Sequence, residues 1–190
     1  MRIRETRIGC IAVLGGALLA VSLPGTAAAE ETTCSGTIGA QTLDNVRVPE
    51  GARCVLKGTH VQGTVKVESA ATLKAKRVRV IGNVQGENAS RVVVKARSRV
   101  GGSVQVKQGA SAKVAKSRVT GDIQYDANGA YLVANSNRVG GSIQVVQNTG
   151  GVEIWRNTVN GNLQCKENSP PPTGGGNVVG GSKEDQCAGL

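Results

Sequence analysis

Aromatic side chains are almost absent from this chain of 190 residues. They make up 2% of the sequence, with two tyrosines, one tryptophan and no phenylalanine, although 39% of the residues are hydrophobic. Most cores of this size bury large areas with aromatic rings, so this interior must be built from Val, Ala, Ile and Leu. The composition excludes a typical helical bundle, disfavours an aromatic-lined catalytic pocket and favours a regular stack of β-branched residues.

Hydrophobic runs long enough to cross a membrane are also missing, because the longest one spans only residues 8–21. It follows three arginines near the start of the chain and precedes Ala27-Ala28-Ala29. This order of basic, apolar and small residues is that of a cleaved secretory signal peptide. We therefore expect residues 1–29 to be removed and the mature chain to be secreted to the exterior of a bacterial cell, without a transmembrane segment.

An internal repeat is the strongest pattern in the sequence. Each copy reads approximately Val-x-Gly-x-Val-Gln-x. Seven copies, the last truncated, start 19 or 20 residues apart, and a degenerate copy fits residues 42–46; the starts are Val61, Val80, Val100, Val119, Val139, Val159 and Val179. Alternating apolar residues, with Gly, Asn and Ser between them, predict two short strands and their turns in each copy. Such a unit cannot bury its own apolar face, so about eight coils must stack as parallel strands about 4.8 Å apart.

Coils of this length with variable turns resemble the right-handed parallel β-helix superfamily, which includes pectate-lyase-like proteins. The right-handed preference of parallel crossovers agrees with this, and a bactofilin-like β-helix is the alternative. The resemblance covers about residues 36–190 and implies an all-β, single-domain, right-handed parallel β-helix. Residues 30–41 would form an N-terminal cap segment and residues 42–190 the helix. The superfamily contains lyases, hydrolases, adhesins and tailspikes, and its catalytic residues have no matching positions here.

Four cysteines remain after removal of the leader, which predicts disulfide bonds in an exported chain. Cys34 and Cys54 are 20 residues apart and Cys165 and Cys187 are 22 apart, close to one coil in each case. Residues one coil apart lie above one another, so we predict the pairs Cys34–Cys54 and Cys165–Cys187, one at each end of the rod. A zinc site is the alternative, but no C-x-x-C spacing is present. The Pro- and Gly-rich residues 169–177 predict a loop in place of the second strand, ahead of a C-terminal cap.

Stacked coils place equivalent residues in rows along the rod, and one such row is glutamine. Its members are Gln85, Gln105, Gln124, Gln144 and Gln164. Each lies between two inward apolar positions and should point outward, where amides can hydrogen bond along the axis. The row is either structural amide pairing on an exposed sheet or a flat polar face for a glycan.

Two further rows are basic. One immediately precedes the first Val of successive copies, with His60 in the same place one coil earlier; it consists of Arg79, Arg99, Arg118 and Arg138. The other stands three residues before that Val, with Ser136 interrupting it; it consists of Arg77, Arg97, Lys116 and Arg156. Because positions two apart share one face of a strand, the two rows should lie side by side.

Basic charge is concentrated in residues 66–118, where 13 lysines and arginines face only Glu68 and Glu87. This patch predicts a binding surface for an anionic cell-wall polymer, an acidic polysaccharide or a phospholipid surface. The alternative is that the basic residues only solubilise the sheets and discourage edge association. Nucleic acid is not expected as a partner, since proteins that bind single strands use stacking aromatics. We expect a monomer.

Catalytic groups are scarce. His60 is the only histidine, Asp122 replaces the Ser or Asn of other copies, and no acidic residue is expected to repeat one coil away. Glycoside hydrolysis needs a carboxylate pair, so we expect a non-enzymatic protein without cofactor or metal site. The alternatives are a minimal or degenerate carbohydrate-active enzyme and a structural surface rod. Trp155 with Tyr125 and Tyr131 forms a candidate sugar-stacking spot, unless Trp155 only covers the end of the basic face.

Overall fold

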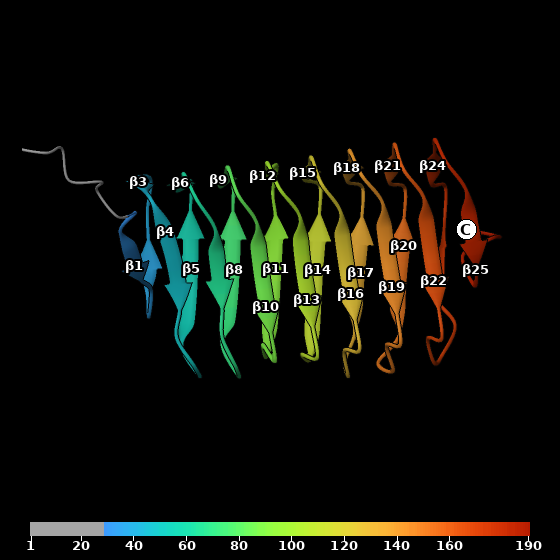
Figure 1. Ribbon diagram of the computed structural model, residues 1–190, viewed down its shortest axis with the longest axis horizontal. Coiled ribbons are helices and arrows are strands. Elements are labelled where there is room, and N and C mark those ends of the chain that lie inside the picture. Colours follow the sequence, from blue (N-terminus) through green and yellow to red (C-terminus); the bar gives the residue numbers. More distant parts are fainter. Residues whose placement is uncertain (1–28) are drawn as a thin grey trace, which may run out of the picture.

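The computed structural model describes residues 29–190, so the leader expected at residues 1–29 lies, apart from Ala29, outside this range. The described chain consists of strands and turns without a helix and winds into a parallel β-solenoid (Figure 1). Three sheets, named A, B and C here, run the length of the rod with nine, eight and eight strands. This confirms the all-β, single-domain solenoid and agrees with about eight coils. The right-handed sense of the coil stays a prediction.

Sheet A contains the Val-Gln-Val part of each repeat. Most of its inward positions are filled by β-branched or Leu side chains that stack in register, such as Val84 on Val104 and Ile123 on Ile143, and all four are buried. In spatial order the strands are β1 (Glu31–Thr33), β4 (Asn45–Val48), β7 (Val65–Val67), β10 (Val84–Glu87), β13 (Val104–Lys107), β16 (Ile123–Asp126), β19 (Ile143–Val146), β22 (Leu163–Lys166) and β25 (Lys183–Asp185).

Sheet B is formed by the second alternating stretch of each repeat. Leu73, Val92 and Ala112 stack on its inner side from one strand to the next, while the residues that alternate with them along each strand face outward. Its strands are β2 (Thr37–Ile38), β5 (Arg53–Lys57), β8 (Thr72–Lys76), β11 (Arg91–Lys95), β14 (Ser111–Ala115), β17 (Leu132–Asn135), β20 (Val152–Trp155) and β23 (Thr173–Gly175).

Sheet C is a third sheet, which the sequence did not predict. The first Val of each repeat and the residue before it form a two-residue strand, separated from sheet A by a tight glycine turn. At Gly101 a Cβ atom would collide with the carbonyl of Ile81 in the preceding coil, so this glycine permits the close stacking of the turns. The strands are β3 (Thr42–Leu43), β6 (His60–Val61), β9 (Arg79–Val80), β12 (Arg99–Val100), β15 (Arg118–Val119), β18 (Arg138–Val139), β21 (Thr158–Val159) and β24 (Val178–Val179).

Both ends of the rod contain a disulfide bond that joins neighbouring coils. Cys34 is bonded to Cys54 with their Cα atoms 5.5 Å apart, and Cys165 to Cys187 with 5.2 Å, which confirms both predicted pairs. Strands β1 and β2 already pair with β4 and β5, so the solenoid begins within the expected cap segment 30–41. The expectation of a loop over residues 169–177 is wrong in part, because β23 pairs with β20 there.

Candidate functional site

The row of arginines expected ahead of the first Val lies on sheet C. Arg79, Arg99, Arg118 and Arg138 are paired with one another in parallel register, one strand spacing apart, and all four side chains are exposed. His60 pairs with Arg79 at the N-terminal end of the row. Like charges stacked at strand spacing repel one another. The fold therefore holds a line of guanidinium groups that costs stability.

The second basic row lies on the corner between sheets B and C, and not on a strand. Arg77, Arg97, Lys116 and Arg156 have φ values of 54°, 64°, 50° and 52°, as does Ser136 at 56°. The prediction that these residues share a strand face with the first row was wrong, because the chain bends through the left-handed region at this position in each coil. The apolar periodicity of the sequence does not show where an isolated residue adopts the left-handed backbone conformation.

The two basic rows nevertheless meet in one groove along this B–C corner. The groove has a volume of about 520 Å³ and also includes Ser98, Ser117 and Asn137 at its floor. Six of its lining residues are cationic: Arg97, Arg99, Lys116, Arg118, Arg138 and Arg156. A line of fixed positive charge along a shallow hollow raises the local concentration of anions. We call this hollow the corner groove.

The backbone of the B–C corner does not require basic residues. An L-residue in the left-handed region costs about 1–2 kcal/mol, and the end coils avoid this cost with Gly58 and Gly176. The corner between sheets A and B makes the same bend in each coil with mostly uncharged residues: Ala70, Asn88, Gln108, Ala127, Gln147 and one acid, Glu167. The chain therefore places cations on only one of two equivalent bends.

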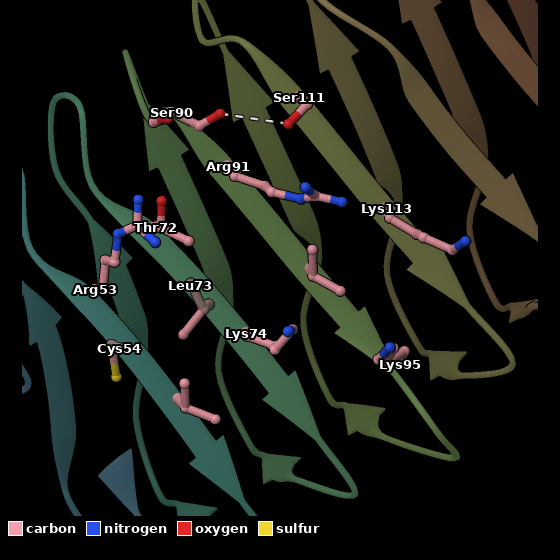
Figure 2. Close-up of a pocket in the computed structure, with 12 residues that line it drawn as sticks. Arg53, Cys54, Thr72, Leu73, Lys74, Ser90, Arg91, Lys95, Ser111 and Lys113 are labelled. Carbon is pink, nitrogen blue, oxygen red and sulfur yellow. Dashed lines mark hydrogen bonds between the residues drawn. The ribbon is translucent and has the colours of Figure 1, made fainter. Parts of the chain in front are cut away.

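The outer face of sheet B carries a second set of cations, which the sequence analysis did not place on a common face. Lys57, Lys76 and Lys95 stack in register at the ends of their strands. Figure 2 shows Lys74, Arg91, Lys95 and Lys113 along the sheet, in a hollow of about 610 Å³ that begins at Arg53. The signal in the sequence was the outward alternation of Lys74 and Lys76, of which Lys76 is repeated one coil later as Lys95. We call this hollow the sheet B groove.

The positive charges of this surface lower the pKa of one of its own lysines. The pKa of the exposed Lys76 ammonium is lowered from its ordinary value of 10.5, first by Lys95, then by Lys74, with smaller contributions from burial, Lys57 and Arg77. Each of these charges is positive, and no carboxylate is among the causes. Lys76 therefore lies in an environment that favours the arrival of an anion.

Together these residues form the basic face, defined as all lysines and arginines of sheets B and C and of the corner between them. Glu153 is the only acid in the strands of these two sheets. None of the ion pairs found in residues 29–190 involves the basic face, since they join Arg47 to Glu31 and Glu68, and Lys166 to Glu167. The fifteen members are Arg53, Lys57, Lys74, Lys76, Arg77, Arg79, Arg91, Lys95, Arg97, Arg99, Lys113, Lys116, Arg118, Arg138 and Arg156.

The glutamine row lies on the outer side of sheet A and is tied together along the axis. Each amide nitrogen donates to the amide oxygen of the next coil, over 3.1 Å from Gln85 to Gln105 and 2.8 Å from Gln105 to Gln124. The row continues through Gln144 and Gln164, whose amide donates to Glu184 on the last strand. These amides satisfy one another, so the row supports a structural role.

Two rows of buried asparagines were not recognised in the sequence. Asn128, Asn148 and Asn168 line the A–B corner, and Asn137, Asn157 and Asn177 the B–C corner. Each side chain accepts the backbone N–H of the previous coil and donates to a buried carbonyl, as Asn148 does to Tyr125 at 3.0 Å. The signal was Asn at a spacing of 20, which resembles an ordinary polar turn until burial is known.

The acidic residues weighed for catalysis have structural neighbours. Asp122 accepts the N–H of Ser142 at 2.7 Å, as Ser and Asn do at the same position in other coils. The expectation that no acid repeats one coil away was wrong. Glu68 and Glu87 follow the stacked pair Val67 and Gly86 and line a common hollow on sheet A. Glu68 forms an ion pair with Arg47, with 3.5 Å between its Oε2 atom and the Nη1 atom of the arginine.

His60 shows no catalytic arrangement. Its side chain is partly buried in the arginine row, and its Nε2 has no hydrogen-bond partner among the described residues. Within residues 29–190 no cluster of three or more His, Cys, Asp or Glu side chains is placed to hold a metal ion. In the same range no helix has the length and apolarity that a membrane crossing requires.

The site is thus a two-groove basic surface on one side of a disulfide-closed solenoid. Sequence analysis placed eight of its fifteen cations in rows, counted five of the seven on sheet B only as part of the basic stretch 66–118, and missed Arg53 and Lys57. Comparison of the chain with protein-family models, with curated proteins and with solved structures gives no match.

Proposed function

We propose that this chain is an exported, non-enzymatic binding protein whose basic face holds an extracellular polyanion, such as an anionic cell-wall polymer or an acidic polysaccharide. One observation carries the proposal. Fifteen cations lie together on two sheets and one corner, a single acid accompanies them, and none of them has an ion-pair partner in residues 29–190. A repeating row of cations is complementary to a polymer with a repeating negative charge.

Solubility alone is a weaker explanation of the basic face. Sheet A is equally exposed, yet its outer positions mix acids and bases, such as Glu87 beside Lys107 and Lys107 beside Asp126. Such mixing solubilises a sheet without repulsion. The basic face instead keeps like charges adjacent through four coils, and all four cations of its second row lie in the left-handed backbone region. The A–B corner makes the same bend without a row of cations, so the fold does not require this repulsion, and its presence on one corner favours a binding role.

Export is proposed from two observations. The two disulfides lie at the ends of the rod, where terminal coils lack a neighbour, and such bonds persist in oxidising compartments. The leader pattern in residues 1–29 points the same way. Membership of the pectate-lyase-like superfamily is likewise a proposal that rests on the coil length and repeat.

We propose that the protein acts as a monomer and not as a building block of filaments. The outermost strands of sheet A both carry acids, with Glu31 on β1 and Glu184 and Asp185 on β25. Like charges on both open edges oppose head-to-tail stacking. A carbohydrate-active enzyme is the remaining alternative, and Glu68 and Glu87 are the pair that such an enzyme would use.

Binding measurements on matched charge variants test the proposal. The basic-face variant replaces three sheet C arginines by glutamine: Arg79→Gln, Arg99→Gln and Arg118→Gln. The control removes the same charge from exposed lysines of sheet A: Lys66→Gln, Lys107→Gln and Lys166→Gln. Each protein is titrated at low and moderate salt with a purified glycerol-phosphate wall polymer and with a polyuronate.

At about 1 kcal/mol for each basic residue near an anionic surface, the basic-face variant should bind about a hundredfold more weakly at low salt. The control should stay within a few-fold of the unmodified protein. Equal weakening of both variants would reduce the effect to net charge and contradict a dedicated surface. Absence of binding at low salt for the unmodified protein would refute the proposal altogether.

A further inference from the structure

The few aromatic residues of this chain are not randomly placed. Tyr125 is fully buried in the core, where its hydroxyl donates to the carbonyl of Val133 at 2.9 Å, so it is not part of the candidate sugar-stacking spot. The other two remain exposed, Tyr131 by 49% and Trp155 by 39%. Tyr131 directly precedes β17 and Trp155 ends β20, so both belong to sheet B, which also carries cations.

Tyr131 lies at the C-terminal end of the sheet B groove. It lines a hollow of about 290 Å³ that shares Arg91, Ser111 and Lys113 with that groove. The combined hollow begins at Arg53 on β5 and reaches Tyr131 four coils later. At about 4.8 Å for each coil, its length along the rod is about 19 Å. A polymer in this groove would pass over cations and end on an aromatic ring.

Trp155 has the corresponding place beside the corner groove. It is followed directly by Arg156, the last cation that lines that groove. Asn135 pairs with Trp155 on the preceding strand, and Gly175 pairs with it on the following one. Each of the two basic grooves therefore has one exposed aromatic ring toward its C-terminal end.

Both rings are held in position by a glycine of the next coil. A Cβ atom on Gly175 would lie 3.1 Å from the ring of Trp155, and one on Gly151 would lie 3.4 Å from the ring of Tyr131. The interaction of the Tyr131 hydroxyl with Glu153 raises the pKa of this phenol to about 12, so the ring stays uncharged. Each ring thus packs against backbone on one side and stays open to solvent on the other, which lowers the entropy cost of stacking.

Hydroxyl groups accompany the cations in the sheet B groove. Thr72, Ser90 and Ser111 line its upper edge in Figure 2, where the Ser111 hydroxyl donates to the Ser90 carbonyl at 3.4 Å. Glu153, the one acid of the two sheets, lies in the row of Lys113 and Val133 beyond Tyr131. From Arg53 to Lys113 the groove therefore offers cations and hydrogen-bonding groups. One coil further toward the C-terminus it offers the ring of Tyr131, where there is little positive charge.

We propose that the ligand of the sheet B groove is an acidic polysaccharide, bound along the rod with its carboxylates or sulfates on the cations and a sugar ring on Tyr131. This inference rests on the proposed function and selects one ligand class within it. The C–H face of a pyranose ring packs well on an aromatic ring, and sugar hydroxyls match the Ser and Thr side chains. A glycerol-phosphate chain has no ring for Tyr131. Single-stranded nucleic acid stacks successive bases on several rings, whereas each groove here offers one.

The test compares three probes of similar charge on the full mature chain. These are a uronic-acid hexasaccharide, inorganic polyphosphate and a short oligothymidylate. Tyr131→Ala removes the proposed stacking ring, and Ile81→Ala is the matched control, because Ile81 is an exposed apolar residue (47%) outside both grooves. Calorimetry gives the affinities, thermal unfolding checks that each variant is folded, and the fluorescence of the single tryptophan, Trp155, reports binding near the corner groove.

We expect Tyr131→Ala to weaken hexasaccharide binding about tenfold and to leave polyphosphate binding unchanged. Ile81→Ala should change neither. Equal loss for both probes, or no loss, would overturn the inference. Oligothymidylate that binds more tightly than the hexasaccharide and depends on Tyr131 would also overturn it, in favour of nucleic acid. Polyphosphate binding without hexasaccharide binding would refute the polysaccharide and leave the proposed function standing, whereas binding of no probe would refute both.

Discussion

Replacing Arg77 by glycine should stabilise the fold and weaken polyanion binding in the same variant. Arg77 has a φ of 54° and an exposed side chain on the B–C corner. A left-handed conformation costs an L-residue about 1–2 kcal/mol, which glycine avoids. Glycine itself destabilises the folded state by about 0.5–1 kcal/mol, because it raises the entropy of the unfolded chain. The expected net gain is about 0.5–1 kcal/mol, to which relief of repulsion with Lys76 adds.

A matched variant separates backbone relief from charge. Ala127 has a φ of 52° and is exposed on the A–B corner, so Ala127→Gly should give a similar gain without touching the basic face. Each variant should melt a few degrees higher in calorimetry, at about 2–4 °C for each kcal/mol in a domain of this size. Only Arg77→Gly should reduce the slope of log affinity against log salt, by up to about 0.7–0.9 for one lost contact with an anionic group of the polymer.

The reasoning would be refuted by a loss of stability in Arg77→Gly together with a gain in Ala127→Gly. That result would mean that Arg77 makes contacts that support the corner and that the basic row is structural. Unchanged salt dependence in Arg77→Gly, measured with a polymer that the unmodified protein binds, would remove Arg77 from the binding surface.

Two further predictions concern the interior and the ends of the rod. Asn148→Ala should destabilise the protein by about 4 kcal/mol in denaturant unfolding, because it removes the acceptor of the backbone and side-chain N–H groups of Asn128 and the side-chain donor to the Tyr125 carbonyl and to Asn168. Gln144→Ala in the glutamine row should cost under 1 kcal/mol, and similar values for the two would contradict the role given to the buried row. Replacing Cys34 and Cys54 by serine should cost about 3 kcal/mol in the same assay, and an unchanged unfolding midpoint would show that the first coil does not need its disulfide.

The register of the solenoid could be predicted from sequence because inward valines repeat without interruption. Val80, Val100 and Val119 stack as the spacing required, and the same periodicity placed both disulfides one coil apart. A one-residue slip would turn every apolar side chain to solvent. The hydrophobic pattern therefore determines the register between neighbouring coils almost completely.

The bends and the buried polar rows could not be predicted in this way. A two-residue strand such as Arg79–Val80 has no alternation of its own, so sheet C merged with its neighbour in the sequence pattern. The left-handed residue at Arg77 and the buried amide of Asn148 depend on backbone geometry and on the neighbouring coil. Asparagine in a turn and asparagine in a core look alike until burial is known.

The basic surface was found only in part for a related reason. The arginines of sheet C each precede the first Val of a repeat, so they align easily in the sequence. The outward positions of sheet B instead alternate between cations and Thr, Ser or Val from coil to coil. Their common face appears only when the strands are placed side by side. The structure thus changes two rows of cations into a wider surface with two grooves.

Mapping the bound polymer by NMR tests the central claim most directly. The chain from residue 30 onward, labelled with ¹⁵N, is titrated with a polyuronate oligosaccharide while backbone amide and arginine side-chain signals are followed. The account predicts that the shifted signals cluster on sheets B and C and the corner between them, including Arg79, Arg99 and Arg118, while the glutamine row of sheet A stays unchanged. Shifts centred on sheet A, or spread evenly over the rod, would contradict it.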